Sequence, residues 1–222
     1  RMDIKSIGVC GAGGTMGAGI AIVAARAGYE AISYDTSSEK LDEARIQTEG
    51  FLQKSVQRGK LTGEDASAVL ARITAHSDIG SLADCDLVIE AVFEDLHVKR
   101  KLFGALDDIC KPATIFASNT STLSITEIAA GCERQDRVVG MHFCLPAQLM
   151  KLIEMSPGIN TSEDSFQKAW AWTEAAGQQP VKTEDKPGFI LNALLVPFNN
   201  DAIRAVEAGV ASPEDIDKAI KS

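Results

Sequence analysis

The amino-acid sequence predicts an α/β protein with a doubly wound, mostly parallel β-sheet, followed by a helical tail. Three observations predict this fold. Short apolar runs typical of buried strands alternate with longer helical runs, a glycine-rich turn joins the first strand to the first helix, and the pattern becomes purely helical near the end of the chain. Alternation of this kind indicates parallel strands, because each parallel pair needs a crossover connection that is usually a helix.

Five apolar runs predict the strands of the main sheet: residues 4–10, 31–34, 87–91, 114–117 and 138–141. The segment 39–58 has apolar positions near helical spacing and predicts a long amphipathic helix. After Pro146 the pattern changes, and residues 151–155 and 179–183 predict two added strands on either side of a helix at 163–176. We therefore expect a sheet larger than the basic parallel unit.

The sequence Asp185-Lys186-Pro187-Gly188 marks a predicted domain boundary, since proline and glycine together end an element and let the chain change direction. A long apolar helix over 189–207 follows, and then a second helix capped by Ser212. We expect two domains, 1–185 and 186–222. Because two helices cannot bury their apolar faces alone, we expect the second domain to be incomplete or to be completed by a partner chain.

Composition excludes several classes of function. The 222 residues are 45% hydrophobic, which allows a sizeable core, and carry a formal net charge of −9, which argues against nucleic-acid binding. No apolar run is long enough to span a bilayer, so we expect no membrane association. The five cysteines are odd in number and lack any Cys-x-x-Cys pair, so we expect neither disulfides nor a metal site, and a cytoplasmic location.

The glycine-rich turn is the most informative motif. It reads Gly-Ala-Gly-Gly-Thr-Met-Gly from Gly11 to Gly17, between a strand and a helix, and the next strand ends at Asp35. These are the parts of a Rossmann-like dinucleotide-binding unit, in which glycines let backbone N–H groups approach a pyrophosphate and the acid accepts hydrogen bonds from the adenosine ribose. An acid at this place favours NAD over NADP. We expect NAD as the cofactor, bound at Gly11, Gly13, Gly14, Thr15, Met16, Gly17 and Asp35.

The spacing of this turn is one residue longer than the usual fingerprint when it is counted from Gly11 through Gly13 to Gly17. Counted from Ala12, it reads Ala-x-Gly-x-x-Gly. One of the two registers must absorb an extra residue in the turn.

His142 is the strongest catalytic candidate among the three histidines. It ends an apolar strand, and ligands of open α/β sheets bind at the carboxyl ends of strands. His76 lies in a polar connection and His97 on a helix, and neither has an acid at a suitable spacing. A packed structural histidine is the alternative interpretation of His142.

Glu154 lies near the end of the next predicted strand, where its carboxylate could reach the imidazole of His142. A carboxylate there would fix the tautomer and stabilise the imidazolium, as proton transfer requires. An ordinary exposed acid on an edge strand is the alternative. The hydroxyl and amide side chains at 118–122 form a third candidate site, since helix capping explains only one or two of them and the rest indicate a polar ligand.

Several ordered motifs together resemble the L-3-hydroxyacyl-CoA dehydrogenase family over essentially the whole chain. Besides the glycine turn, they are residues 90–94, 117–121, 140–143, 150–154 and 187–192. The resemblance implies reversible, NAD-dependent oxidation of a (3S)-3-hydroxyacyl-CoA to the 3-oxoacyl-CoA. It implies that His142 is the general base, that Glu154 orients it, and that Ser121 and Asn192 position the substrate.

The same resemblance implies further contacts and a partner. It implies that the cofactor, besides meeting Asp35 and the glycine turn, contacts Ala91, Glu94, Lys99 and Asn119. It implies that the basic end of the helix after the second strand, with Lys54, Arg58 and Lys60, binds the CoA phosphates. The other interpretation of these three residues is a solvated helix face. It also implies a homodimer formed through the helical domain.

One departure from the family pattern follows the proposed base. The family usually reads His-Phe-Phe-Asn-Pro, whereas this chain has Leu145 in place of the asparagine, so any hydrogen bond of that amide is missing. Two other functions remain open. One is a related dehydrogenase that acts on free hydroxy or sugar acids, and the other is a catalytically weak, NAD-binding structural protein like some lens crystallins.

Overall fold

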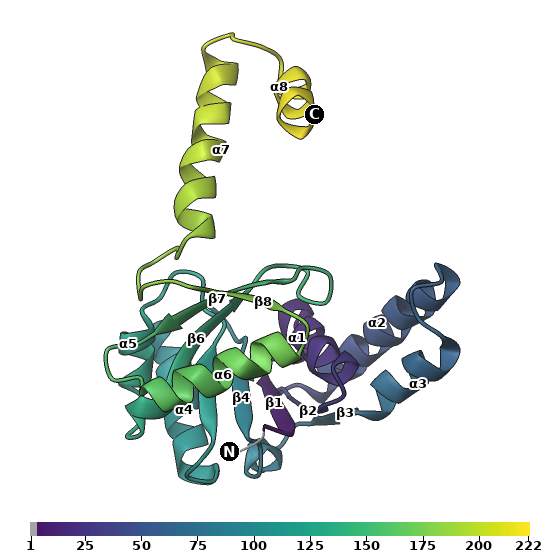
Figure 1. Cartoon of the computed structure of the whole chain (residues 1–222), viewed down its shortest axis with the longest axis vertical. Helices are drawn as coiled ribbons and strands as arrows, with labels where there is room; N and C mark the ends of the chain where they lie inside the picture. Colours follow the sequence, from purple (N-terminus) through teal and green to yellow (C-terminus); the bar gives the residue numbers. More distant parts are fainter. Residues whose placement is uncertain (1–3) are drawn as a thin grey trace.

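A single eight-stranded sheet forms the centre of the computed structural model, which describes residues 4–222 (Figure 1). The strand order is β3-β2-β1-β4-β5-β6-β7-β8, and neighbours are parallel except β6 and β7. The strands are β1 (Ser6–Cys10), β2 (Glu30–Tyr34), β3 (Ile73–His76), β4 (Leu87–Glu90), β5 (Ile115–Ser118), β6 (Val138–Phe143), β7 (Leu152–Pro157) and β8 (Gln179–Lys182). The predicted doubly wound, mostly parallel sheet with added strands is confirmed.

Helices pack on both faces of the sheet. One buried cluster joins the sheet to α1 (Thr15–Arg26), α2 (Ser38–Gln57), α3 (Gly63–Ala71) and α6 (Glu163–Ala175). The other cluster joins its opposite face to α4 (Leu96–Ile109), α5 (Ile125–Ala129) and the short 3₁₀ helix η1 (Ile79–Leu82). A second 3₁₀ turn, η2 (Gln135–Arg137), leads into β6. The central strands are buried on both sides, which explains why they read as continuous apolar runs.

Strand β3 and helix α3 are among the elements that the sequence pattern does not predict. Strand β3 lies at the edge of the sheet and three of its four residues are exposed, so no apolar run announces it. Helix α3 is short and begins with a capping box between Thr62 and Asp65. The placement of His76 in a polar connection is therefore wrong, because it is the last residue of β3.

The added strands bring the two halves of the predicted catalytic pair together. Strand β7 runs antiparallel to β6, and His142 pairs directly with Glu154 in the register. Facing residues of an antiparallel pair have side chains close enough to interact.

Two helices follow the sheet domain, α7 (Leu191–Glu207) and α8 (Pro213–Lys221), and Figure 1 shows α7 leading away from the sheet. Helix α7 begins two residues later than predicted, because Gly188 and Phe189 adopt positive φ angles of 82° and 46°. The predicted cap at Ser212 is confirmed, since its side chain accepts a hydrogen bond from the Asp215 N–H. Within residues 4–222, no helix is both long and apolar enough to cross a membrane.

Candidate active site

The predicted site residues gather at the carboxyl ends of neighbouring parallel strands. Gly11 follows β1, Ala91 follows β4, Asn119 follows β5, and His142 is the penultimate residue of β6. Parallel strands end at the same edge of a sheet, which is where open α/β folds bind ligands. The fold therefore places the glycine turn and the proposed base at a common edge.

The glycine turn adopts the register in which Gly14 and Gly17 are the last two glycines of the fingerprint. Gly14 is the N-cap of α1, and a side chain on Gly17 would overlap the carbonyl oxygen of Gly11. This is the close helix–strand packing that the third glycine provides. The extra residue lies between Gly11 and Gly14, in a tight turn closed by a 3.1 Å hydrogen bond from the Gly14 N–H to the Gly11 carbonyl.

The turn fits a dinucleotide. Gly11 has a φ of +76° and a Cβ there would lie 2.5 Å from the Ala91 carbonyl, so only glycine is accommodated. Gly14 caps α1 without a side-chain hydrogen bond, and the first turn of that helix, which begins with Thr15 and Met16, contains no acidic residue. The N–H groups at the start of α1 are thus available to an anionic pyrophosphate.

The carboxylate of Asp35 is held in place at the end of β2. Its Oδ2 accepts a hydrogen bond from the Gly13 N–H at 3.1 Å, and its Oδ1 accepts one from the Ser37 N–H at 3.1 Å. A Cβ on Gly13 would lie 2.8 Å from Oδ2 and 2.6 Å from the Cβ of Lys40. The residue inserted into the turn therefore helps to fix the carboxylate of Asp35.

His142 lies between Glu154 and Ser121. Its Nδ1 is 2.7 Å from Oε2 of Glu154, which is fully buried, and its Nε2 is 3.0 Å from Oγ of Ser121. Because a carboxylate faces Nδ1, that nitrogen carries the proton and donates, which leaves the lone pair of Nε2 to accept a proton. The ring of Phe189 packs against the imidazole, with ring centroids 5.6 Å apart and an angle of 39° between the ring planes.

The second oxygen of Glu154 holds the start of α7. Its Oε1 accepts hydrogen bonds from the Ile190 and Leu191 N–H groups at 2.9 and 2.8 Å. Asn192 follows directly, in the first turn of α7. One buried carboxylate thus links the proposed base to the helix that carries the proposed substrate-positioning amide, a contact that sequence reasoning missed because backbone N–H groups leave no signal in the sequence.

Three more predicted cofactor residues have clear partners in the structure. Asn119 accepts a 2.8 Å hydrogen bond from the Phe143 N–H, which joins the ends of β5 and β6. The side chain of Glu94 reaches the loop after β5, where it accepts hydrogen bonds from the Ser121 and Thr122 N–H groups. The ammonium of Lys99 is buried and lies 2.5 Å from Glu90 and 3.3 Å from Glu94.

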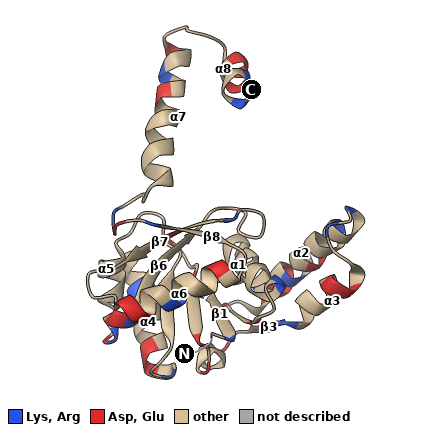
Figure 2. Cartoon of the chain, in the orientation of Figure 1, with Lys and Arg blue, Asp and Glu red and all other residues tan. Residues whose placement is uncertain are grey.

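Leu145 and the three basic residues expected to bind the CoA phosphates are exposed. Lys54, Arg58 and Lys60 are exposed at the outer end of α2, where Figure 2 shows basic residues at the tip of the α2–α3 pair. Leu145, in the connection between β6 and β7, is 61% exposed. The structure itself does not bring the three basic residues to His142.

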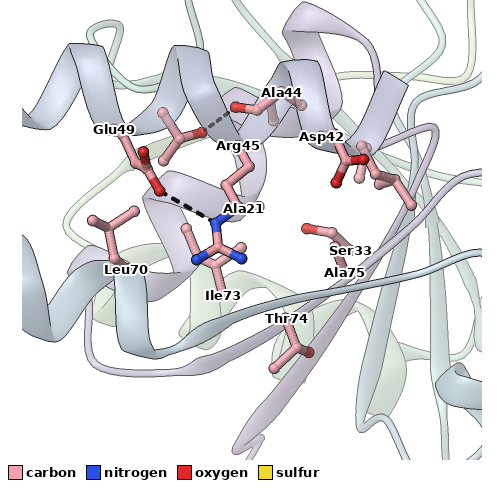
Figure 3. A pocket seen from close by; sticks show the side chains of 14 residues that line it. Ala21, Ser33, Asp42, Ala44, Arg45, Glu49, Leu70, Ile73, Thr74 and Ala75 are labelled. Carbon is pink, nitrogen blue, oxygen red and sulfur yellow. Dashed lines mark hydrogen bonds and ion pairs between the residues drawn. The ribbon is translucent and has the colours of Figure 1, made fainter. Parts of the chain in front are cut away.

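A separate cavity lies between the sheet and the helices of its α1 face. It has a volume of about 390 Å³ and is lined by residues of α1, α2, α3, β2 and β3, together with Ala12 of the glycine turn, and the Arg45–Glu49 ion pair forms part of this lining (Figure 3). None of the predicted site residues lines it. Within residues 4–222, no group of three or more histidine, cysteine or acidic side chains could hold a metal ion. The five cysteines are buried and unpaired.

Two family models match almost the whole chain. The NAD-binding domain of 3-hydroxyacyl-CoA dehydrogenase matches residues 6–186, and the C-terminal domain of the same enzyme family matches residues 188–222. The chain belongs to the 3-hydroxyacyl-CoA dehydrogenase family. The predicted family is thus confirmed, and the predicted cofactor, NAD, is confirmed by the domain that matches.

Similar proteins support this assignment. The chain is 43% identical over 220 residues to 3-hydroxyadipyl-CoA dehydrogenase of Escherichia coli, covering 99% of this chain and 46% of the relative. It is 42% identical over 220 residues to a probable 3-hydroxybutyryl-CoA dehydrogenase of Bacillus subtilis, covering 99% and 76%. A crystal structure of Mycobacterium tuberculosis FadB2 is similar with a TM-score of 0.95 and 39% identity, covering 98% of this chain and 77% of that one. The chain thus spans about half of the first relative and about three quarters of the other two.

Proposed function

We propose that this protein is an NAD-dependent dehydrogenase that interconverts a (3S)-3-hydroxyacyl-CoA and the 3-oxoacyl-CoA. The observation that carries the proposal is the placement of His142, with Glu154 at 2.7 Å from Nδ1 and Ser121 at 3.0 Å from Nε2, at the same sheet edge as the glycine turn. Relatives that are 42% and 43% identical are named for 3-hydroxybutyryl-CoA and 3-hydroxyadipyl-CoA. These names support a 3-hydroxyacyl thioester as the substrate class.

The residues of the site divide the chemistry between them. When bound, NAD supplies the acceptor for the hydrogen that leaves C3 of the substrate with its electron pair. His142 takes the proton of the 3-hydroxyl on Nε2, while Glu154 keeps Nδ1 protonated and stabilises the charge that forms on the ring. In the reverse direction the same nitrogen returns the proton to the carbonyl oxygen.

Ser121 and Asn192 position the reacting oxygen. The Ser121 hydroxyl already lies within hydrogen-bond distance of His142 Nε2, so a substrate hydroxyl that approaches this nitrogen also meets the serine. A preorganised donor aimed at the oxygen stabilises the charge that develops on it during the reaction. We assign the CoA phosphates to Lys54, Arg58 and Lys60, whose exposure and positive charge on a chain of net charge −9 support this role.

An assay of acetoacetyl-CoA reduction tests this function, with the loss of NADH absorbance as the measured signal. We expect turnover with the CoA thioester, little with free acetoacetate, and a loss of orders of magnitude in the variant His142→Gln with NADH binding retained. Turnover of the free acid alone would indicate a hydroxy-acid dehydrogenase. Tight NADH binding with no turnover of either compound would indicate the structural, crystallin-like role.

We further propose that the boundary between an NAD-binding domain and a helical domain lies at residues 185 and 186. The change from one matching family domain to the other between residues 186 and 188 supports it. The helical domain serves homodimerisation, which is supported by exposed apolar residues on α7, such as Leu194, Val196, Phe198 and Ile203. Light scattering coupled to size-exclusion chromatography tests the dimer. A cytoplasmic location is supported by the five unpaired cysteines.

A further inference from the structure

Glu94 joins two loops that belong to different parts of the proposed site. It lies in the loop after β4, and its Oε1 faces the loop after β5, which carries Ser121. This single oxygen accepts hydrogen bonds from the N–H groups of Ser121 and Thr122, both at 2.9 Å. It also accepts hydrogen bonds from the hydroxyl groups of Thr120 at 2.5 Å and of Thr122 at 3.0 Å. Consecutive backbone N–H groups that converge on one carboxylate fix the conformation of their loop.

The other oxygen of Glu94 is held by a buried lysine. Lys99 Nζ lies 3.3 Å from Oε2 of Glu94 and 2.5 Å from Oε1 of Glu90, and the side chains of Lys99 and Glu90 are 1% and 0% exposed. Glu90 is anchored in turn, since its Oε2 accepts a 2.7 Å hydrogen bond from the Ser118 hydroxyl. Because a buried ammonium must stay paired, Lys99 cannot turn away from these two carboxylates. Glu94 is therefore clamped from both sides.

The carboxylate of Glu94 is an anion over the whole physiological range. Burial by itself would raise its pKa, but the Thr120 hydroxyl, the charge of Lys99 and the two backbone N–H groups outweigh this effect and lower the pKa to about 2. The hydrogen bonds that it accepts are charge-assisted, which makes them stronger than bonds to a neutral group.

We propose that Glu94 is a positioning residue that sets Ser121 against His142, and that it acts on the reaction through this serine. The kinetic part of this inference rests on the proposed function. The inference also extends that function, because the family resemblance assigns Glu94 only to contact with the cofactor. The Ser121 hydroxyl is useful only while it stays within hydrogen-bond distance of the atom that reacts. A displacement of about 1 Å in such a group lowers rates by up to about 100-fold.

Hydrogen exchange in the cofactor-free protein tests the structural part without any substrate. In the variant Glu94→Gln, the amide oxygen of glutamine can serve only one of the two sides that the carboxylate serves, because its NH₂ group then faces either Lys99 or the backbone N–H groups. We expect the amides of residues 120–122 to exchange at least about 10-fold faster in Glu94→Gln than in the wild type. The variant Asp108→Asn, which changes an exposed acid on α4, should leave this exchange unchanged. Unaltered exchange at 120–122 in Glu94→Gln would overturn the proposal.

A double-mutant cycle tests the kinetic part. In the wild-type background, we expect Glu94→Gln to lower kcat for acetoacetyl-CoA by about 10-fold or more, while the Kd of NADH, measured by its fluorescence, changes less than about 3-fold. In the Ser121→Ala background, the same substitution should lower kcat by less than about 2-fold, because the group through which it acts is gone. An equal loss of kcat in both backgrounds, or a large rise in the Kd of NADH, would show that Glu94 acts on the cofactor and not through the serine. A wild-type protein that turns over no acyl-CoA would refute the proposed function, whereas the exchange measurement would still decide whether Glu94 orders the loop.

Discussion

The carboxylate of Glu154 meets His142 and the start of α7 at the same time. Its Oε2 lies 2.7 Å from His142 Nδ1, and its Oε1 accepts hydrogen bonds from the first N–H groups of the helical segment at 2.8 and 2.9 Å. The orientation of the proposed base and the attachment of the C-terminal helices therefore depend on one fully buried side chain.

The first prediction concerns the variant Glu154→Gln. A glutamine can accept from His142 Nδ1 or from the α7 N–H groups, but its NH₂ group then faces donors on the other side. We expect kcat to fall by about 100-fold or more and the Tm to fall by several degrees, because one buried set of donors loses its acceptor.

Steady-state kinetics and thermal unfolding check this prediction, and His142→Gln is the control. That control should lose kcat as well, but it leaves the bond between Glu154 and α7 intact, so its Tm should fall less. A Glu154→Gln protein as stable and as active as the wild type would contradict the double role of this carboxylate.

Much of the arrangement of the candidate site could be predicted because its side chains lie at the ends of apolar strands. The turn at 11–17, Asp35 and His142 each follow a strand that the hydrophobic pattern reveals. Glu154 could be paired with His142 because a short connection joins their antiparallel strands, which places both residues in one register. The resemblance to a family supplied roles for Ser121 and Asn192 that spacing alone could not.

The missed features have physical reasons as well. Strand β3 is a short edge strand with exposed residues, so burial imposes no pattern on its sequence. Glu94 and Glu154 each accept hydrogen bonds from two backbone N–H groups, which every residue except proline carries and which therefore leave no mark in the sequence. The register of the glycine turn depends on whether Gly13 or Gly14 is its middle glycine, and only the structure shows that Gly14 is the N-cap of α1 while Gly13 packs against Asp35.

The second prediction concerns Asp35. Because its carboxylate is fixed by the Gly13 and Ser37 N–H groups, it is preorganised to accept hydrogen bonds from the ribose. We expect Asp35→Ala to raise the Kd of NADH by about 10-fold or more and to narrow the preference for NAD over NADP, since the carboxylate that repels a 2′-phosphate is removed. Fluorescence titrations with NADH and NADPH measure both effects, and Asp42→Ala, an exposed acid on α2, is the control. Unchanged selectivity would exclude Asp35 from the ribose site.

The third prediction separates the two neighbouring glycines of the turn. A Cβ on Gly13 would collide with Asp35 Oδ2 at 2.8 Å and with Lys40 at 2.6 Å, whereas a Cβ on Gly14 would meet only the Gly11 carbonyl at 3.4 Å. We expect Gly13→Ala to lower the Tm of the cofactor-free protein and to weaken NADH binding, because Asp35 must move. Gly14→Ala should leave the Tm within about 2 °C of the wild type but weaken NADH binding, because its methyl group projects where the pyrophosphate approaches the helix. Equal effects of the two substitutions on Tm would contradict the register described above.

The last prediction concerns Asp185, which ties the end of the sheet domain to the start of α5. Its two oxygens accept hydrogen bonds from the Ile125 N–H at 2.6 Å, the Thr126 N–H at 2.9 Å and the hydroxyls of Ser124 and Thr126 at 2.8 and 2.6 Å. Burial by itself would raise the pKa of Asp185, but these hydrogen bonds outweigh it and hold the pKa below its ordinary value of 3.8. A carboxyl group whose pKa is lowered by folding stabilises the folded state above its ordinary pKa, and this contribution disappears as the pH falls through the lower, folded value.

We therefore expect Asp185→Asn to lower the Tm by several degrees at pH 7. The difference in Tm from the wild type should stay constant down to about pH 5 and close below about pH 4. Thermal unfolding of both proteins from pH 8 to pH 3 measures this gap, and Glu184→Gln, which changes the exposed neighbouring acid, should show none. A gap that persists undiminished at pH 3 would mean that the charge of Asp185 does not stabilise the folded protein.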